Sequence, residues 1–305
     1  YSIMDISDFL TDFKLQLPDI KGRPLHAISV HLGWLNWGSV GEESFNKLVE
    51  FFKAEKIGEL VRPGDFYNFV AYRDYSHTYI DSEGVRHTEF PNSKVFYVRR
   101  EEPLRDLVLF YLLEPTQFGE IYVDKVVALL KRLNVVRYQV IGAMGSPVPH
   151  TRPIRISGRS SAPEVTERLK EIGVRATGGA QYQGPTSIFN SISSRLQSDG
   201  VTTVSLIAHM PTYLSLEEPD NNGVFSILNV LSKLEGIEIP LGRFQSAGKK
   251  QYDNVTKEVN RSQSITDLSK ELEDIYDQEE EKPREKTTQL PPNIQKAIDE
   301  AFDKS

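Results

Sequence analysis

The chain has 305 residues, with 36 Lys and Arg against 43 Asp and Glu, which gives a formal net charge of −7. It contains no cysteine, so disulfides and thiolate metal sites are excluded. No apolar run approaches the roughly 20 residues of a membrane span, and the absence of a basic stripe argues against nucleic-acid binding.

The negative charge is concentrated in one C-terminal stretch. Residues 253–281 contain three Lys or Arg and ten Asp or Glu, a net charge of −7, whereas residues 1–252 carry a net charge of −1. The first residues, Tyr1–Asp5, lack the basic segment followed by an apolar one that marks a secretion signal. We therefore expect a soluble cytoplasmic protein without membrane contact.

The first predicted elements are a strand, a loop and a helix. The apolar run Pro24–Leu32 predicts a buried strand, and the glycine-rich loop Gly33–Gly41 follows it. Apolar residues at helical spacing predict a helix over Glu42–Lys53. The next segment is rich in aromatic and β-branched residues. We expect its strands over Glu59–Arg62, Phe66–Tyr72, Thr78–Ile80, Val85–Phe90, Lys94–Val98 and Asp106–Leu113.

Strands and helices alternate in the next part of the chain. The predicted strands are Val135–Ala143 and Val201–Ala208, and the predicted helices are Gln117–Leu133, Ala162–Leu169, Thr186–Gln197 and Asn221–Leu234. Such alternation, together with the hairpin-rich middle, predicts an α/β fold: an α/β/α layer sandwich with a mixed sheet.

The composition changes after Pro240, where charges become dense and apolar residues sparse. Residues at helical spacing over Leu241–Tyr276 predict amphipathic acidic helices that pack on the body or on a partner. A charged linker over Gln278–Gln289 and a last helix over Asn293–Phe302 follow. We therefore divide the chain into an α/β domain, residues 1–240, and an acidic helical extension, residues 241–305.

The glycine-rich loop is the first candidate binding site. A helix that starts after a strand can hold an anion with its free N–H groups, and glycines allow close approach. The spacing is neither the dinucleotide fingerprint nor the P-loop. The alternative is a tight turn whose two tryptophans cover the edge of the core. The candidate residues are Gly33, Trp34, Asn36, Trp37, Gly38 and Gly41.

The second candidate is the stretch Ser146–Pro153, where three prolines stiffen the backbone around His150 and Arg152. It follows a predicted strand, and the carboxyl ends of strands are where ligands bind in open α/β sheets. His150 could act as an acid or base, and Arg152 could bind a carboxylate or phosphate. The alternative is a rigid loop whose His and Arg tie neighbouring segments together.

Two further candidates are Gly184 with Thr186, at a helix start, and His209 with Tyr213, at the end of a predicted strand. No Gly-x-Ser-x-Gly motif is present, and no Asp is placed to orient His150. We therefore assign no catalytic residue. The histidines are scattered without the spacing of a zinc site, so we expect no metal and no cofactor.

These residues, taken in order, resemble the proteasome assembly chaperone family, in particular the bacterial relatives of its second type. The resemblance extends from about Pro24 to Leu241, and Val148–Pro153 is its most specific part. The matching segments are Gly33-Trp34, Gly38, Pro63–Phe69, Arg105–Leu109, Gly142-Ala143, Val148–Pro153, Gly184–Thr186 and Ser205–Tyr213. An acidic helical extension is also usual in the bacterial branch.

The resemblance implies a phosphorylase/hydrolase-like α/β/α body, a homo-oligomer with a trimer favoured, and a non-enzymatic assembly chaperone or scaffold with a protein client. The chain departs from the family at Asn36-Trp37, where Asp-Ala is frequent, and at Thr212, where His is frequent. It ends Asp303-Lys304-Ser305, without the hydrophobic-Tyr ending of archaeal members that dock on the proteasome. The alternative function is a hydrolase or phosphorylase-like protein that binds an anionic small molecule at the strand ends.

Overall fold

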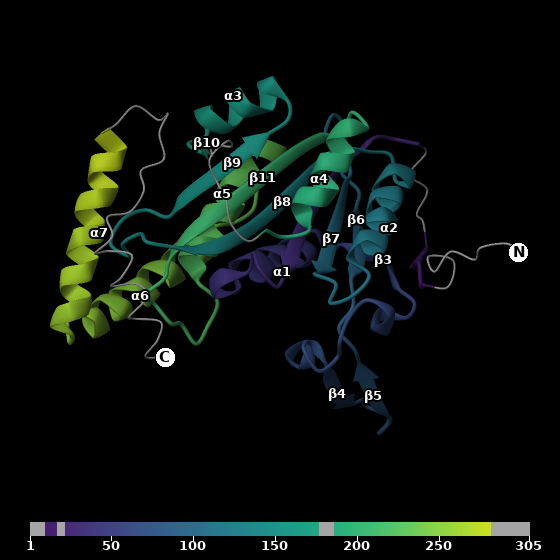
Figure 1. Ribbon diagram of the computed structural model, residues 1–305, viewed down its shortest axis with the longest axis horizontal. Coiled ribbons are helices and arrows are strands. Elements are labelled where there is room, and N and C mark those ends of the chain that lie inside the picture. Colours follow the sequence, from purple (N-terminus) through teal and green to yellow (C-terminus); the bar gives the residue numbers. More distant parts are fainter. Residues whose placement is uncertain (1–9, 17–21, 177–185, 282–305) are drawn as a thin grey trace, which may run out of the picture. The chain divides into compact units, whose positions relative to one another are not determined.

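The computed structural model describes residues 10–16, 22–176 and 186–281 (Figure 1). The chain divides into two compact units, each assembled from separated stretches. The first takes its described residues from 1–33, 48–140 and 186–203. The second takes them from 34–47, 141–185 and 204–305.

The sheet of the first unit is mixed. Its strands are, in spatial order, β1 (Phe13–Leu15), β3 (Glu55–Leu60), β6 (Lys94–Val98), β7 (Leu107–Leu113), β2 (Leu25–Leu32) and the start of β8 (Val135–Ser146). β2 pairs in parallel with both β7 and β8, whereas β3, β6 and β7 pair antiparallel. The central strands β2 and β7 are apolar and buried along most of their length, as expected for strands covered on both faces.

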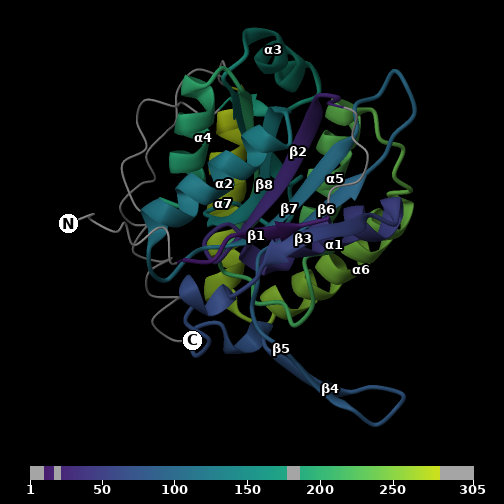
Figure 2. The same cartoon turned by 90° about the vertical axis from the view of Figure 1, so that its right-hand side faces the viewer.

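Two helices of the first unit, α2 (Gly119–Arg132) and α4 (Phe189–Ser198), lie side by side on one face of this sheet (Figure 2). Their apolar stripes face inward, because residues three and four apart share one side of a helix. The side chains that they bury include Tyr122, Val126, Leu130, Ile192 and Leu196.

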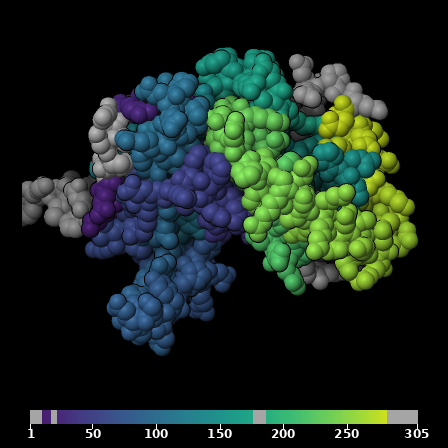
Figure 3. Space-filling model, turned by 180° about the vertical axis from the view of Figure 1, so that it is seen from behind, coloured from purple at the N-terminus to yellow at the C-terminus, as the bar shows by residue number. Residues whose placement is uncertain are grey.

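A two-stranded hairpin projects from the first unit, as Figure 3 shows at its lower edge. It consists of β4 (His77–Ile80) and β5 (Arg86–Glu89), joined by a turn in which Asp81 N–H donates to Val85 O. Every residue of both strands is exposed. The hairpin therefore lacks a core of its own.

The second unit contains the end of β8, then most of β11 (Thr202–Pro211), β9 (Arg155–Ser160) and β10 (Arg175–Ala176). β9 pairs antiparallel with β11 and parallel with β10. Its helices are α3 (Pro163–Glu171), α5 (Asn221–Glu235), α6 (Gly242–Val259), α7 (Gln263–Glu281) and most of α1 (Val40–Phe52). None of the described helices combines the length and the apolar character needed to cross a bilayer.

The predicted fold class is confirmed: the chain has mixed-sheet α/β architecture, with helices at its C-terminal end. The acidic extension forms α6 and α7, and α7 continues to Glu281, past the predicted end at Tyr276. The predicted last helix lies outside the described residues.

Several predicted strands are wrong in position or extent. Residues Phe66–Tyr72 form a series of turns after the 3₁₀ helix Pro63–Asp65 and not a strand. Their aromatic residues are typical of a strand, but Phe66 and Tyr67 are buried here because they anchor a loop. The strand expected over Glu59–Arg62 is β3, four residues earlier at its start. β1, β9 and β10 carry no clear alternating pattern, so the sequence predicts none of them.

Candidate functional site

The ends of β8 and β11 meet in the second unit, where the backbone N–H of Thr212 donates to Ser146 O over 3.2 Å. This brings the proline-rich segment after β8 next to the segment after β11. Four sequence candidates are thereby gathered: His150, Arg152, His209 and Tyr213. β2 is parallel to β8, and Asn36 after β2 bridges to Ala143 of β8, so the glycine-rich loop reaches the same edge.

His150 is 4% exposed, and both of its ring nitrogens are engaged. Its backbone N–H donates to Tyr213 Oη over 2.8 Å, and Tyr213 Oη lies 2.6 Å from Nδ1. Thr256 Oγ1 of α6 donates its only proton to Tyr252 O, so it accepts from Nε2–H over 3.2 Å, and Nδ1 therefore accepts the proton of Tyr213 Oη.

Burial lowers the pKa of His150, although the carboxylate of Glu273 opposes this shift. The imidazole is therefore neutral at pH 7. It joins three segments: the proline-rich loop, the residues after β11, and α6. In this state it has no free nitrogen with which to act on a ligand.

Arg152 holds helix α7. Its Nε and Nη2 donate to the two carboxylate oxygens of Asp277 over 2.9 and 2.6 Å, and Nη1 lies 3.6 Å from Glu273. This is the two-pronged geometry in which guanidinium binds carboxylate best. The pair lowers the pKa of Asp277. The carboxylate that Arg152 binds therefore belongs to α7 of the same chain and not to a ligand.

His209 joins three neighbouring strands. Its Nδ1 shares a hydrogen bond of 2.8 Å with Ser146 Oγ on β8, and its Nε2 shares one of 2.7 Å with Ser157 Oγ on β9. Burial lowers the pKa of His209 to about 4, and the charges of Arg155 and Arg175 add to this effect. His209 is therefore neutral at pH 7, and both nitrogens are satisfied.

In the glycine-rich loop, the side chain of Asn36 is hydrogen-bonded to the first turn of α1: its Oδ1 accepts from the backbone N–H of Glu42 over 2.9 Å. Gly38 has a left-handed φ of 59° and its carbonyl accepts the N–H of Asp220 over 3.0 Å. A Cβ at Gly41 would lie 3.0 Å from Leu35 O, so only glycine fits there without movement. These residues shape the turn.

The two tryptophans differ in exposure and in surroundings. Trp34 is 49% exposed. Trp37 lies over Gly145 of β8, where an added Cβ would come within 2.9 Å of its ring. Trp37 is therefore part of the packing at the strand ends, while Trp34 presents its ring to solvent.

Two candidates fall in the other unit, and one is outside the described residues. Gly33 belongs to the first unit, and a Cβ added to it would lie 3.6 Å from the side chain of Glu114. Thr186, also in the first unit, is exposed and accepts a hydrogen bond from Asn190 Nδ2. Gly184 lies outside the described residues.

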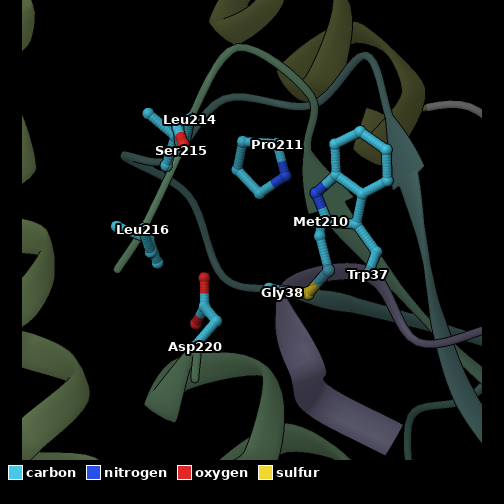
Figure 4. A pocket seen from close by; sticks show the side chains of 8 residues that line it. All are labelled: Trp37, Gly38, Met210, Pro211, Leu214, Ser215, Leu216 and Asp220. Carbon is cyan, nitrogen blue, oxygen red and sulfur yellow. The ribbon is translucent and has the colours of Figure 1, made fainter. Parts of the chain in front are cut away.

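A pocket of about 180 Å³ lies between the glycine-rich loop and the segment after β11 (Figure 4). Small-molecule sites usually enclose about 300–1,000 Å³, so this pocket suits one side chain or a group of a few atoms. The lining residues are Trp37, Gly38, Met210, Pro211, Leu214, Ser215, Leu216 and Asp220.

Asp220 is the ionisable residue of this pocket, and the candidate list lacks it. One carboxylate oxygen accepts the N–H groups of Asn222 and Gly223 at the start of α5, each over 3.0 Å. The other accepts from Tyr252 Oη over 2.7 Å, and burial raises the pKa of Asp220. Asp before a helical stretch is a capping signal, which could have identified its structural role.

The arginines that face α7 were also missed as a group. Arg155 and Arg175 lie on β9 and β10, and both pair with Glu280 of α7. Neither strand was predicted, and their partners are more than 100 residues away in sequence. Within the described part of the chain, no three His, Asp or Glu residues are grouped as metal ligands would be.

The sequence profile of the PAC2 family matches residues 30–259. A PAC2 family protein from Streptomyces avermitilis is 26% identical, with a TM-score of 0.69, covering 79% of this chain and 98% of that chain. A proteasome-assembly chaperone homologue from Mycobacterium tuberculosis is 21% identical, with a TM-score of 0.67 over 80% of this chain and 99% of that chain.

The archaeal proteasome activator PbaB from Pyrococcus furiosus shares the fold at 16% identity, with a TM-score of 0.61 over 81% of this chain and 98% of that chain. No curated protein is detectably similar in sequence. The family profile covers most of the α/β body, together with α6, and includes the strand ends and the proline-rich segment. The chain belongs to the PAC2 family.

Proposed function

We propose that this protein is a non-enzymatic, chaperone-like interaction scaffold of the cytoplasm, which works as a homo-oligomer, with a trimer favoured, and contacts a protein client. Family membership supports the proposal, because structural neighbours include a proteasome-assembly chaperone homologue and a proteasome activator. The proposal depends mainly on one observation: His150, Arg152 and His209, the polar side chains at the strand ends, all bind other parts of the chain and so are not available to a substrate.

The projecting hairpin offers a surface for such contacts. Tyr79, Ile80 and Val85 are 47%, 63% and 51% exposed. An isolated two-stranded hairpin is at best marginally stable in water, and exposed apolar side chains gain free energy when a partner covers them. A contact with another chain would cover these residues and stabilise the hairpin.

The alternative, an enzyme acting on an anionic small molecule, has less support. Arg152 is already paired with the carboxylates of α7. The pocket beside the glycine-rich loop is lined by Asp220, whose carboxylate would repel an anion unless protonated. We therefore place this function second.

Light scattering on the purified full-length chain tests the proposal, with co-purifying proteins identified by mass spectrometry. We expect a defined oligomer, and we expect Ile80→Ser with Val85→Ser to reduce the oligomer or its captured client. Val61→Ser is the matched control, because Val61 is 60% exposed but lies outside the hairpin. A wild-type monomer without any bound protein would contradict the scaffold.

A further inference from the structure

Three arginines of the second unit face helix α7 and form what we call the arginine edge: Arg152, Arg155 and Arg175. Arg152 lies in the proline-rich segment, and the other two lie on β9 and β10. Helix α7 carries the opposite charge, because residues 263–281 contain one Lys against eight Asp and Glu. The helix and the edge are therefore complementary in charge.

The contacts between them are predominantly ionic. The ion pairs join Arg152 to Asp277 at 2.6 Å, Arg155 to Glu279 at 2.6 Å and to Glu280 at 3.3 Å, and Arg175 to Glu280. The guanidinium of Arg155 also lies 3.4 Å over the ring of Tyr276 and donates to its carbonyl. Two of these carboxylates, Asp277 and Glu280, are exposed, so water and salt compete with their pairs.

The apolar contribution to this attachment comes from one stripe of α7, in which Leu268, Leu272 and Tyr276 are buried. A buried cluster of Leu268 and Leu272 of α7 has Tyr213 and Ile275 packed against it. Only residues 260–262 separate α6 from α7, so a change in this short connection would move α7 as a unit. A competing helix that carries the same carboxylates and the same apolar stripe would make these same contacts.

We propose that the arginine edge is a docking surface for an acidic amphipathic helix of a protein partner, and that α7 occupies it until such a helix displaces it. α7 defines the chemistry of the partner: carboxylates at positions i, i+4 and i+7, as at Glu273, Asp277 and Glu280, beside an apolar stripe. The inference rests on the proposed function, because it names the class of client that the scaffold binds.

A labelled peptide with the sequence of residues 262–281 tests the surface by fluorescence anisotropy. In the full-length chain, Glu273→Gln, Asp277→Asn and Glu280→Gln together weaken the resident helix. We expect this variant to bind the peptide at least about tenfold more tightly than the wild type does. Binding should weaken between about 50 and 500 mM NaCl, because salt screens exposed charge pairs.

The matched control replaces three acidic residues with the same spacing on another face of α7: Asp267→Asn, Glu271→Gln and Asp274→Asn. All three are exposed, and none forms an ion pair with the arginine edge. The change in charge is equal, so this variant should bind the peptide as weakly as the wild type. Equal gains in both variants would overturn the proposal, because they would reflect net charge alone.

Adding Arg152→Gln and Arg175→Gln to the neutralised variant that weakens the resident helix should abolish its gain in peptide affinity. Circular dichroism should remain that of a folded protein. A folded neutralised variant that does not bind the peptide would also overturn the inference, and it would leave the scaffold function standing if light scattering shows an oligomer. Conversely, a wild-type chain that is monomeric and binds no client would contradict the scaffold function, even if the peptide binds.

The absence of native cysteine allows a direct test of which copy supplies α7. Chains carrying Thr151→Cys alone are mixed with chains carrying Glu273→Cys alone and treated with a short bis-maleimide. The two side chains contact each other within one chain, so the proposal expects no cross-linked dimer. A strong dimer band would place α7 on a second copy and would contradict its role as a resident occupant.

Discussion

His209 shows how a single side chain can hold a sheet together from inside. Its two nitrogens join serines of β8 and β9 while its backbone belongs to β11. A protonated imidazole would lose one acceptor and place a charge beside Arg155 and Arg175, which also lower the pKa. Burial, the main cause of the lowered pKa, and these two charges therefore favour the neutral form of His209.

This predicts a pH dependence of the free energy of unfolding. The pKa of His209 is about 4 in the folded chain against 6.5 for an unperturbed histidine, so the unfolded state binds more protons between these values. Stability should fall by about 3 kcal/mol from pH 6.5 to pH 4 on account of this residue. His209→Gln should show a smaller loss over the same range in urea titrations.

The control for this pH experiment is His77→Gln, because His77 is exposed on the hairpin. It should keep the wild-type pH dependence. If His209→Gln and the wild type lose the same amount of stability between pH 6.5 and pH 4, the buried neutral state of His209 is wrong.

Tyr213 is the second residue on which the strand ends depend. Its hydroxyl accepts from the His150 backbone and donates to the His150 ring, so Tyr213→Phe leaves two buried groups without this partner. We expect a loss of about 1–3 kcal/mol in the free energy of unfolding, since an unsatisfied buried group costs that much. Tyr79→Phe, at an exposed tyrosine, should change stability by much less.

At the scale of elements, helix α5 begins at a cap that also forms a wall of the pocket. Asp220 accepts two backbone N–H groups of α5 and the hydroxyl of Tyr252 on α6, and Gly236 ends the helix in a left-handed conformation. The N-cap residue Asp220 thus positions α5, and α6 is attached to that same carboxylate.

Two substitutions of Asp220 distinguish the contribution of helix capping to stability from the contribution of its charge. Asp220→Ala removes all three acceptor contacts, and we expect it to lower stability by about 1–3 kcal/mol. Asp220→Asn keeps an acceptor oxygen for the two N–H groups and should lose much less. Thermal unfolding of both variants gives the comparison, and equal losses would show that the cap contributes little.

Helices α6 and α7 together cover the strand ends of the second unit. Thr256 and Tyr252 of α6, and Ser269 and Glu273 of α7, contact the groups around His150 and Asp220. Part of the charge concentrated in residues 253–281 therefore has a structural use, because Asp277, Glu279 and Glu280 pair with the arginine edge.

At the scale of the whole molecule, the two compact units should respond differently to loss of the extension. Deletion of residues 242–305 uncovers His150, Tyr213 and Arg155, all in the second unit. In hydrogen exchange, we expect β9 and β11 to lose protection, while β2 and β7 of the first unit keep theirs. Uniform loss across both units would contradict this division, and unchanged exchange would show that the extension does not stabilise the strand ends.

The sequence predicts the architecture where patterns are local. The buried strands β2 and β7 and the helices α1, α2, α3 and α5 come within about two residues of their predicted bounds, because continuous apolar runs and helical stripes are properties of the segment itself. The loop Phe66–Tyr72 was misassigned for the opposite reason: its aromatic residues are buried by contacts with distant parts of the chain.

For the candidate site, the sequence alone determined that a stiff, polar segment follows β8, that His209 and Tyr213 follow a buried strand, and that an acidic amphipathic segment lies near the C-terminal end. Only the tertiary structure decided that these parts bind one another. The pairs His150 with Thr256 and Arg152 with Asp277 join residues 106 and 125 positions apart. Such pairing depends on how strands and helices are packed, and no local spacing encodes it.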